Sequence, residues 1–154
     1  MENNTEVTQQ TPTSDERLLA MFSHFSIFLG GIILPIILYF VQKDKSKFVA
    51  FHALQSIFFH LFYAAIIFVL IIFLVLVLLA TGVLGLALSK SSGSGSPGAG
   101  FFIGMGIFYI GLFGSILLAI AYGIYMGIKA YNGEMKKYIV VGNWAYKKVY
   151  GSSN

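Results

Sequence analysis

Hydrophobic residues are gathered into three long stretches that contain no Asp, Glu, Lys or Arg. The first stretch runs from Leu18 to Gln42, the second from Phe48 to Ser89, and the third from Ser91 to Ile128. A helix needs about 20 apolar residues to cross the roughly 30 Å of hydrocarbon in a bilayer. The pattern predicts an all-α integral membrane protein with three transmembrane helices. The predicted spans cover about 18–41, 57–80 and 101–130.

The first stretch is interrupted by Gly30, Gly31 and Pro35. Proline lacks a backbone donor and clashes with the preceding turn, so we expect a kink near Gly31. One interpretation is a single bent span. The other is a surface helix over residues 15–28 followed by a short inserted half. We favour the bent span, because residues 18–42 are long enough to cross with some tilt.

The second stretch is too long for one straight span. Its middle reads FYAAIIFVLIIFLVLVLLA and contains none of the Gly, Pro or Asn residues that a tight turn requires. We therefore predict one span over 57–80 rather than two. Residues 48–56 precede it as an amphipathic helical lead-in, and residues 81–100 form a Gly/Ser-rich loop.

Small residues recur every four positions along the third stretch, at Gly111, Ser115, Ala119, Gly123 and Gly127. In lipid, such a ridge lets helix backbones approach closely and gain dispersion contacts. The ridge packs against another helix of this chain or against a second copy, and we favour the first. Asn132 and Gly133 follow, and Gly133 suits the left-handed conformation that ends a helix.

The ends of the chain are polar. Ser14 is suited to cap the first helix, and the residues before it lack hydrophobic periodicity. After the last span, pairs of Lys alternate with Tyr138, Trp144 and Tyr146, which is typical of a membrane interface. The predicted organisation is a disordered tail over 1–14, a single membrane domain over 15–145 and a C-terminal tail over 146–154.

Composition supports a membrane protein and excludes several kinds of chemistry. The chain of 154 residues is 57% hydrophobic and 10% charged, with a mean hydropathy of +0.81. Soluble domains have about 25% charged residues, so this chain has too few to cover a water-facing surface. Because there is no Cys, disulfides and cysteine nucleophiles are excluded. The six acids all lie outside the apolar stretches, so we expect no enzyme and no cofactor. The basic residues lie beside apolar stretches, which indicates a membrane surface, so we expect no nucleic-acid partner.

The distribution of lysine predicts an orientation. The linker QKDKSK and the tail from Lys129 onward carry eight of the ten basic residues. Three spans would place both segments on one side, which the positive-inside rule identifies as cytoplasmic. We therefore expect a multi-pass protein of the cell (plasma) membrane with its N-terminus outside and its C-terminus in the cytoplasm. Its expected partners are the lipid bilayer and either other membrane proteins or a second copy.

Polar residues are concentrated where the second span begins, in KFVAFHALQSIFFH. At about 100° per residue, His52 and Ser56 share a helix face, with Gln55 and His60 beside them. His24 of the first span is a possible partner for this stripe. We favour a structural role, in which the stripe either faces headgroup water or hydrogen-bonds to the linker and to neighbouring helices. A proton relay through His52 and His60 stays open. A metal site of His24, His52 and His60 is weaker still, because no carboxylate lies nearby, and we expect none.

Three blocks of sequence resemble a known family. They are ERLLAMFSHFSIFLGGIILPIILYFVQKDKSKFV (16–49), FVAFHALQSIFF (48–59) and GIKAYNGEMKKYIVVGNWA (127–145). They are similar to bacterial relatives of the twenty-kilodalton Tic subunit of the chloroplast inner-envelope import translocon. The bacterial members are small membrane proteins of unknown function. The resemblance implies a helical membrane protein, and it suggests protein translocation by analogy alone. Ala50 stands where relatives commonly have Arg.

Three functional hypotheses follow. We favour a non-enzymatic scaffold or accessory subunit of a membrane complex. The alternatives are a small transporter or channel that uses the polar stripe, and an immunity or stress protein that protects the membrane.

Overall fold

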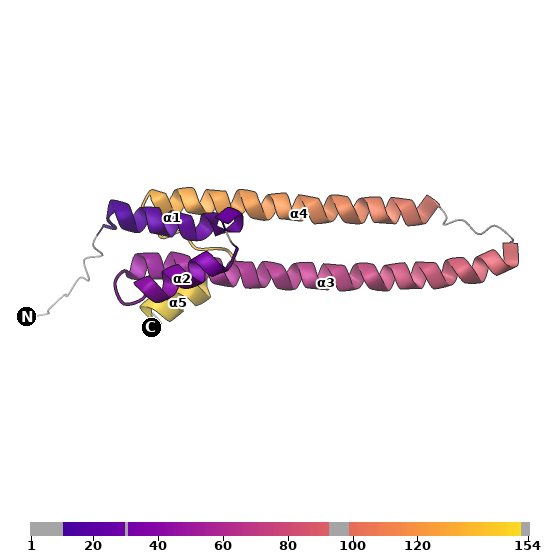
Figure 1. The fold of residues 1–154 in the computed structure, drawn as a ribbon, viewed down its shortest axis with the longest axis horizontal. Helices are drawn as coiled ribbons and strands as arrows, with labels where there is room; N and C mark the ends of the chain where they lie inside the picture. Colours follow the sequence, from indigo (N-terminus) through magenta and orange to yellow (C-terminus); the bar gives the residue numbers. More distant parts are fainter. Residues whose placement is uncertain (1–10, 30, 93–98, 152–154) are drawn as a thin grey trace, which may run out of the picture. The chain divides into compact units, whose positions relative to one another are not determined.

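The regular structure in the described part of the chain is entirely helical, which confirms the predicted all-α class (Figure 1). The computed structural model describes residues 11–29, 31–92 and 99–151. Its helices are α1 (Ser14–Leu29), α2 (Ile33–Gln42), α3 (Lys47–Ser92), α4 (Ala99–Tyr131) and α5 (Gly142–Tyr150). Most of the predicted N-terminal tail, Gly30, and the middle of the predicted Gly/Ser loop lie outside the described residues.

Two helices are long and apolar enough, by length and composition, to cross a membrane. The candidate spans are Lys47–Gly82 in α3 and Gly104–Tyr131 in α4. The apolar helix α2 has 10 residues and is therefore about 15 Å long, half the thickness of the hydrocarbon. The prediction of three full spans is thus not confirmed, and the structure supports two.

The first apolar stretch forms two helices instead of the predicted bent span. Gly31 has a φ of +61°, in the left-handed region, and its N–H donates to the carbonyl of Ser26 at 2.7 Å. The chain then reverses, and α2 runs back along α1 (Figure 1). Pro35 is buried in the first turn of α2, where its missing N–H breaks no helical hydrogen bond. The glycine therefore ends the helix, and the proline lies within the next one.

The start of α1 is capped by Thr13 rather than by the expected Ser14. The Thr13 N–H donates to Oε2 of Glu16 at 2.7 Å, and the Glu16 N–H donates to Oγ1 of Thr13 at 3.3 Å. This reciprocal pair is a capping box, which the sequence TSDE encodes. A hydrogen bond from the Ser46 hydroxyl is the main cause that lowers the pKa of the Glu16 carboxyl, and the Thr13 backbone adds to it.

The hairpin formed by α1 and α2 brings three segments of unit 1 close together. Ser46, which contacts Glu16, belongs to the linker between α2 and α3. Near the end of α4, a methyl group at Gly133 would lie 3.2 Å from Nε of Arg17. The start of α1, the linker and the end of α4 are therefore neighbours.

Helix α3 is longer than the pattern of polar residues suggests. It begins at Lys47 and continues without a break through the predicted lead-in and span to Ser92. Most of the predicted loop over 81–100 is therefore helical, because α3 ends at Ser92 and α4 begins at Ala99. Gly costs a helix only about 1 kcal/mol per residue and Ser less, so a long apolar helix can extend into this segment.

The end of α4 follows the expected use of Asn132 and Gly133. Gly133 has a φ of +79°, and its N–H donates to the carbonyl of Ala130 at 2.9 Å. The N–H of Glu134 donates to the carbonyl of Lys129 at 3.0 Å. These two bonds form a Schellman motif, which satisfies the last carbonyls of the helix. The chain then runs without regular structure to α5.

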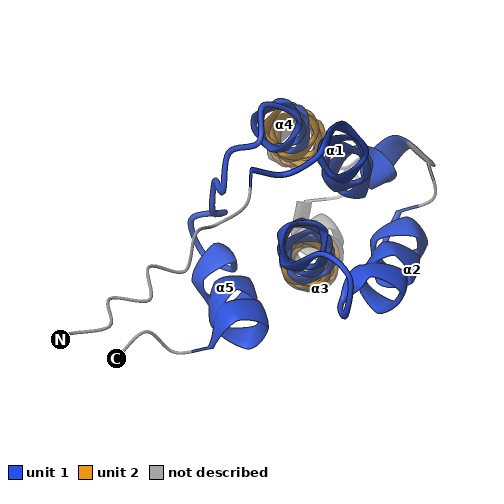
Figure 2. Ribbon diagram, turned by 90° about the vertical axis from the view of Figure 1, so that its left-hand side faces the viewer, with its two compact units in different colours: residues 1–60, 123–154 blue, residues 61–122 orange. Residues whose placement is uncertain are grey.

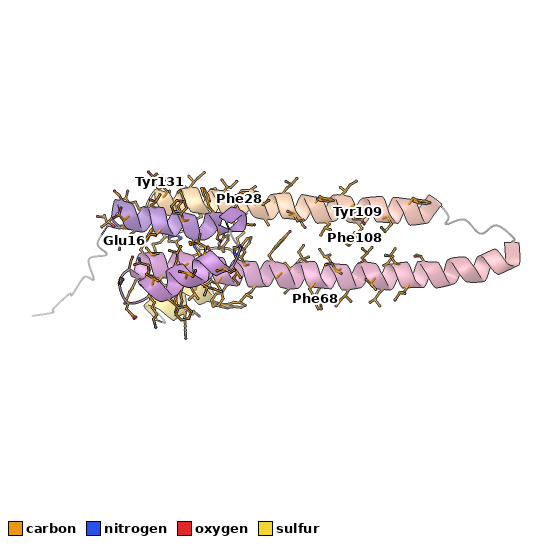
Figure 3. The ribbon with its side chains drawn as sticks, viewed as in Figure 1. Glu16, Phe28, Phe68, Phe108, Tyr109 and Tyr131 are labelled. Carbon is orange, nitrogen blue, oxygen red and sulfur yellow. The ribbon has the colours of Figure 1, made fainter. Side chains whose placement is uncertain are left out.

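The chain divides into two compact units (Figure 2). Unit 1 comprises residues 1–60 and 123–154, and unit 2 comprises residues 61–122. In unit 1, α1, α2 and α5 surround the first turns of α3 (Figure 2). The core here consists of Phe51, Leu54 and Ala145, and side chains from α2 and α5 pack against it. In unit 2, large side chains such as Phe68 and Tyr109 lie exposed along the helices (Figure 3).

Candidate functional site

Five polar side chains from three segments meet inside unit 1. They are His24 of α1, His52, Gln55 and Ser56 of α3, and Tyr138 of the segment after α4, and we call them the polar cluster. All five are buried, with His24 2% exposed and His52 0%. A buried polar group costs free energy unless it is hydrogen-bonded, so their partners decide what the cluster does.

The two histidines hydrogen-bond to each other. Nε2 of His24 lies 3.0 Å from Nδ1 of His52, and the rings meet edge to face with centroids 5.2 Å apart. One of these nitrogens must carry the proton and the other must be unprotonated. Which ring donates follows from the other groups around them.

Gln55 determines the direction of this bond. Its Nε2 donates to the carbonyl of Lys136 at 3.1 Å, and its Oε1 accepts from the N–H of Tyr138 at 3.2 Å. These two backbone groups orient the amide, so its second N–H is free to donate to Nδ1 of His52, 3.1 Å away. Nδ1 of His52 is then an acceptor, and that ring carries its proton on Nε2.

The remaining bonds follow from this assignment. His24 donates from Nε2, so its Nδ1 accepts. Ser56 Oγ lies 2.9 Å from that nitrogen, and the Tyr138 hydroxyl lies 3.2 Å from it. Both hydroxyls donate to the single lone pair of this nitrogen, which they share, and both histidines are neutral. The cluster thus joins α1, α3 and the segment after α4 by directed hydrogen bonds.

One proton of the cluster has no acceptor. Nε2 of His52 is buried and makes no hydrogen bond within the described part of the chain. The backbone carbonyl of Glu134 lies near the ring, but the contact does not reach hydrogen-bonding geometry. An unpaired buried N–H costs about 1–3 kcal/mol, so this atom is the least satisfied part of the cluster.

Not all residues of the predicted polar stripe belong to the polar cluster. His60 does not bond to the other histidines, because its Nδ1 donates to the carbonyl of Ser56 on its own helix at 2.8 Å. The pattern of Lys and aromatic residues predicts Tyr138 at the membrane interface with neighbouring lysines. It is instead buried and stacked on Phe59, with ring centroids 4.5 Å apart. The alternation of Lys and aromatic residues gave no sign of this buried position.

A comparison with family models gives a match over residues 15–145, to the magnetosome magnetite crystal formation protein family. The chain belongs to this family. No curated protein and no solved structure matches the chain.

This match contradicts the resemblance to relatives of the chloroplast import translocon. The blocks that suggested it, over 16–49, 48–59 and 127–145, all lie inside the matched region. These blocks belong to a different family of small proteins, the magnetosome magnetite crystal formation family. Protein translocation therefore has no support here.

The description of the family names magnetite, which is an iron mineral, so a metal-binding group of side chains is one site to look for. The described residues contain no group of three or more His, Cys, Asp or Glu placed to hold a metal ion. Both ring nitrogens of His24 are used within the cluster. His24, His52 and His60, which are possible ligands of a metal site that we do not expect, do not form a three-histidine group among the described residues.

The ridge of small residues is used differently along its length. In unit 1, a methyl group at Gly127 would lie 2.5 Å from Cε1 of Phe25, and one at Gly123 would lie 3.5 Å from the carbonyl oxygen of His24. Here the ridge allows α4 to approach α1. In unit 2, a methyl group at Gly111 would meet nothing within 4 Å. Ser115 donates to the carbonyl of Leu112 on its own helix.

Unit 2 also contains an apolar cavity between α3 and α4. It has a volume of about 350 Å³ and is lined by side chains that include Phe73, Val77 and Phe108. The hydroxyl of Thr81 borders it and donates to the carbonyl of Val77 at 2.8 Å. The cavity therefore offers hydrophobic contacts and no charge.

Proposed function

We propose that this protein is a non-enzymatic, membrane-embedded accessory subunit or scaffold of a membrane complex. Membership in the magnetosome magnetite crystal formation family supports a role near a membrane rather than a reaction in solution. The observation that carries the proposal is the polar cluster, in which five buried polar side chains bond mainly to one another.

A catalytic or transport site presents its polar groups to a substrate. Here His24, His52 and Ser56 are each at most 2% exposed. Gln55 uses its amide to hold the backbone of Lys136 and Tyr138. These groups are occupied in joining helices, which supports a structural role for the cluster.

The acidic residues also favour an accessory role over direct contact with a mineral. Iron ions bind carboxylate oxygens well, and a mineral surface needs several of them together. Among the described acids, Glu16 belongs to a helix cap and Glu134 pairs with Lys129 at 2.9 Å. A protein of this family with so few acids would act on the membrane or on a partner protein.

We propose a membrane orientation that differs from the one predicted from the sequence. The helical hairpin returns to the linker, where Lys43, Lys45 and Lys47 lie, and the start of α1 is close to the end of α4. With α3 and α4 as the two spans, the positive-inside rule places this lysine-rich end in the cytoplasm. The N-terminus then lies on the cytoplasmic side with the C-terminus, in place of the outside location predicted from the sequence.

Single-cysteine labelling tests this orientation, since the chain has no Cys of its own. Thr11→Cys and Gly151→Cys should resist a membrane-impermeant maleimide in intact cells and react after permeabilisation. Ser94→Cys, between α3 and α4 in sequence, serves as the control and should react in intact cells. Labelling of Thr11→Cys together with Ser94→Cys would contradict the two-span arrangement.

Isolation under mild conditions tests the accessory role. The tagged protein is crosslinked in the cells of its source, extracted in a mild detergent and analysed by native electrophoresis. We expect it to migrate with other membrane proteins. A second sample carrying His24→Leu should lose those partners, because unit 1 would be destabilised. Isolation of the wild-type protein as a lone, uncrosslinked monomer would overturn the proposal.

A proton-conducting function is the second candidate, and the unpaired Nε2 of His52 favours it. Such a chain would accept and release protons through neighbouring histidines and hydroxyls. Purified protein in vesicles should then dissipate a pH gradient, and His52→Ala should abolish the flux. Flux no greater than that of empty vesicles would remove this candidate.

A further inference from the structure

The segment after α4 carries an exposed surface that the polar cluster does not use. We call it the α5 surface, and its residues are Lys136, Ile139, Val140, Trp144, Lys147 and Lys148. Ile139 is 85% exposed and Trp144 is 62% exposed. Large apolar side chains of this kind, in a segment outside both candidate spans, indicate contact with something apolar.

Helix α5 separates its two faces clearly. Ala145 is buried in the core of unit 1, and Tyr146 stacks on Tyr150 with centroids 4.8 Å apart. Trp144, Lys147 and Lys148 occupy the outer face, at spacings of three and four residues. The exposed tryptophan and the two exposed lysines therefore lie on the same exposed face of α5.

The charge of this surface has one sign. No Asp or Glu occurs from Met135 to Tyr150. The acid just before it, Glu134, is already paired with Lys129. Lys136, Lys147 and Lys148 are thus left without acidic neighbours in their own segment, so the surface suits an anionic partner.

We propose that the α5 surface binds the anionic phospholipid headgroups of the bilayer. The segment follows a candidate span directly, so it lies within reach of the headgroup region. Lysines pair with lipid phosphates, while Trp144, Ile139 and Val140 enter the apolar boundary below them. A nucleic acid would match the lysines but would offer no apolar layer to the aliphatic side chains. This inference does not depend on the proposed accessory role.

The fluorescence of tryptophan tests the proposal directly, because Trp144 is the only Trp in the chain. The full-length protein in a neutral detergent is titrated with short-chain phosphatidylglycerol, or with short-chain phosphatidylcholine. Phosphatidylglycerol should shift the emission to the blue with a half-saturation about tenfold lower than that of phosphatidylcholine. Inorganic phosphate should leave the emission unchanged, which distinguishes a lipid headgroup from the free ion.

Two double variants remove the same net charge from different places. Lys147→Gln with Lys148→Gln should raise the half-saturation for phosphatidylglycerol about tenfold. Lys43→Gln with Lys45→Gln, in the linker, should raise it less than about twofold. Val140→Ser should reduce the blue shift while keeping the preference for the anionic lipid. All the changed side chains are exposed, and circular dichroism verifies that the helices remain.

Three results would overturn the proposal. The first is equal half-saturation for the two lipids. The second is an equal loss in the two double variants, which would mean that net charge alone is sensed. The third is a DNA oligonucleotide that changes Trp144 emission at lower concentration than phosphatidylglycerol does.

Discussion

In unit 1, the start of α3 buries His52, Gln55 and Ser56, whereas in unit 2 the same helix exposes Phe68 and its neighbours. Directed hydrogen bonds join the helices of unit 1, and each bond specifies one partner atom. The helices of unit 2 have apolar outer faces. Lipid tails are as apolar as these side chains, so such faces can contact lipid as favourably as another helix. The difference suggests that unit 1 owes its arrangement to the polar cluster, and unit 2 owes its stability mainly to the membrane.

The largest expected effect comes from His24→Leu. The change keeps a similar volume but leaves the bonds to His52, Ser56 and Tyr138 unmade. Because each unpaired buried group is costly, unit 1 should lose about 3 kcal/mol of unfolding free energy. Reversible unfolding in mixed micelles, followed by circular dichroism, measures it. His60→Leu is the matched control and should cost less than about 1 kcal/mol. Equal losses would show that the cluster does not hold unit 1 together.

A smaller effect should distinguish the two halves of the glycine ridge. Gly127→Ala places a methyl group 2.5 Å from the Phe25 ring, so the ring must move. We expect a net loss of about 1 kcal/mol after the gain in helix propensity. Gly111→Ala meets nothing within 4 Å and should be neutral or slightly stabilising. Thermal unfolding of both variants in one detergent makes the comparison. A clear loss in Gly111→Ala would instead indicate a second copy packed on that part of the ridge.

The outcomes at these sites show what a sequence allows one to predict. The break near Gly31, the end of α4 at Gly133 and the shared face of His52 and Ser56 follow from local rules. The bond between His24 and Tyr138 joins residues 114 positions apart, and no local rule specifies it. The sequence also gave no reason to expect that the chain would reverse at Gly31 rather than bend, because both outcomes require a helix break at the same glycine.

Within unit 2, the hydroxyl of Tyr63 lies 3.3 Å from Oγ of Ser115 and links α3 to α4. Interhelical hydrogen bonds in lipid contribute about 0.6 kcal/mol on average. Tyr63→Phe should therefore cost no more than about 0.6 kcal/mol, several times less than His24→Leu. The same unfolding assay in micelles tests it. A cost near 3 kcal/mol would show that unit 2 also depends on directed bonds.

The smallest effect concerns acid. The Ser46 hydroxyl and the Thr13 backbone lower the pKa of Glu16 in the folded state. Its contribution is therefore present above the ordinary Glu pKa of about 4.5 and is lost as pH falls through the lowered value. Unfolding measured between pH 6 and pH 3 should show a slight loss of stability at the acid end, and Glu16→Gln should reduce that pH dependence. An unchanged pH profile in the variant would mean that other groups cause the loss.

The polar cluster also imposes an order on biosynthesis. His24, His52, Gln55 and Ser56 leave the ribosome long before Tyr138, because most of α3 and all of α4 are synthesised between Ser56 and that residue. Until Tyr138 arrives, Oε1 of Gln55 lacks its backbone donor and His24 lacks one of its two hydroxyl partners. Unit 1 therefore completes its folding only after the segment beyond α4 has been made. A chain that stops before this segment leaves the cluster incomplete and unit 1 without the bonds that Tyr138 supplies.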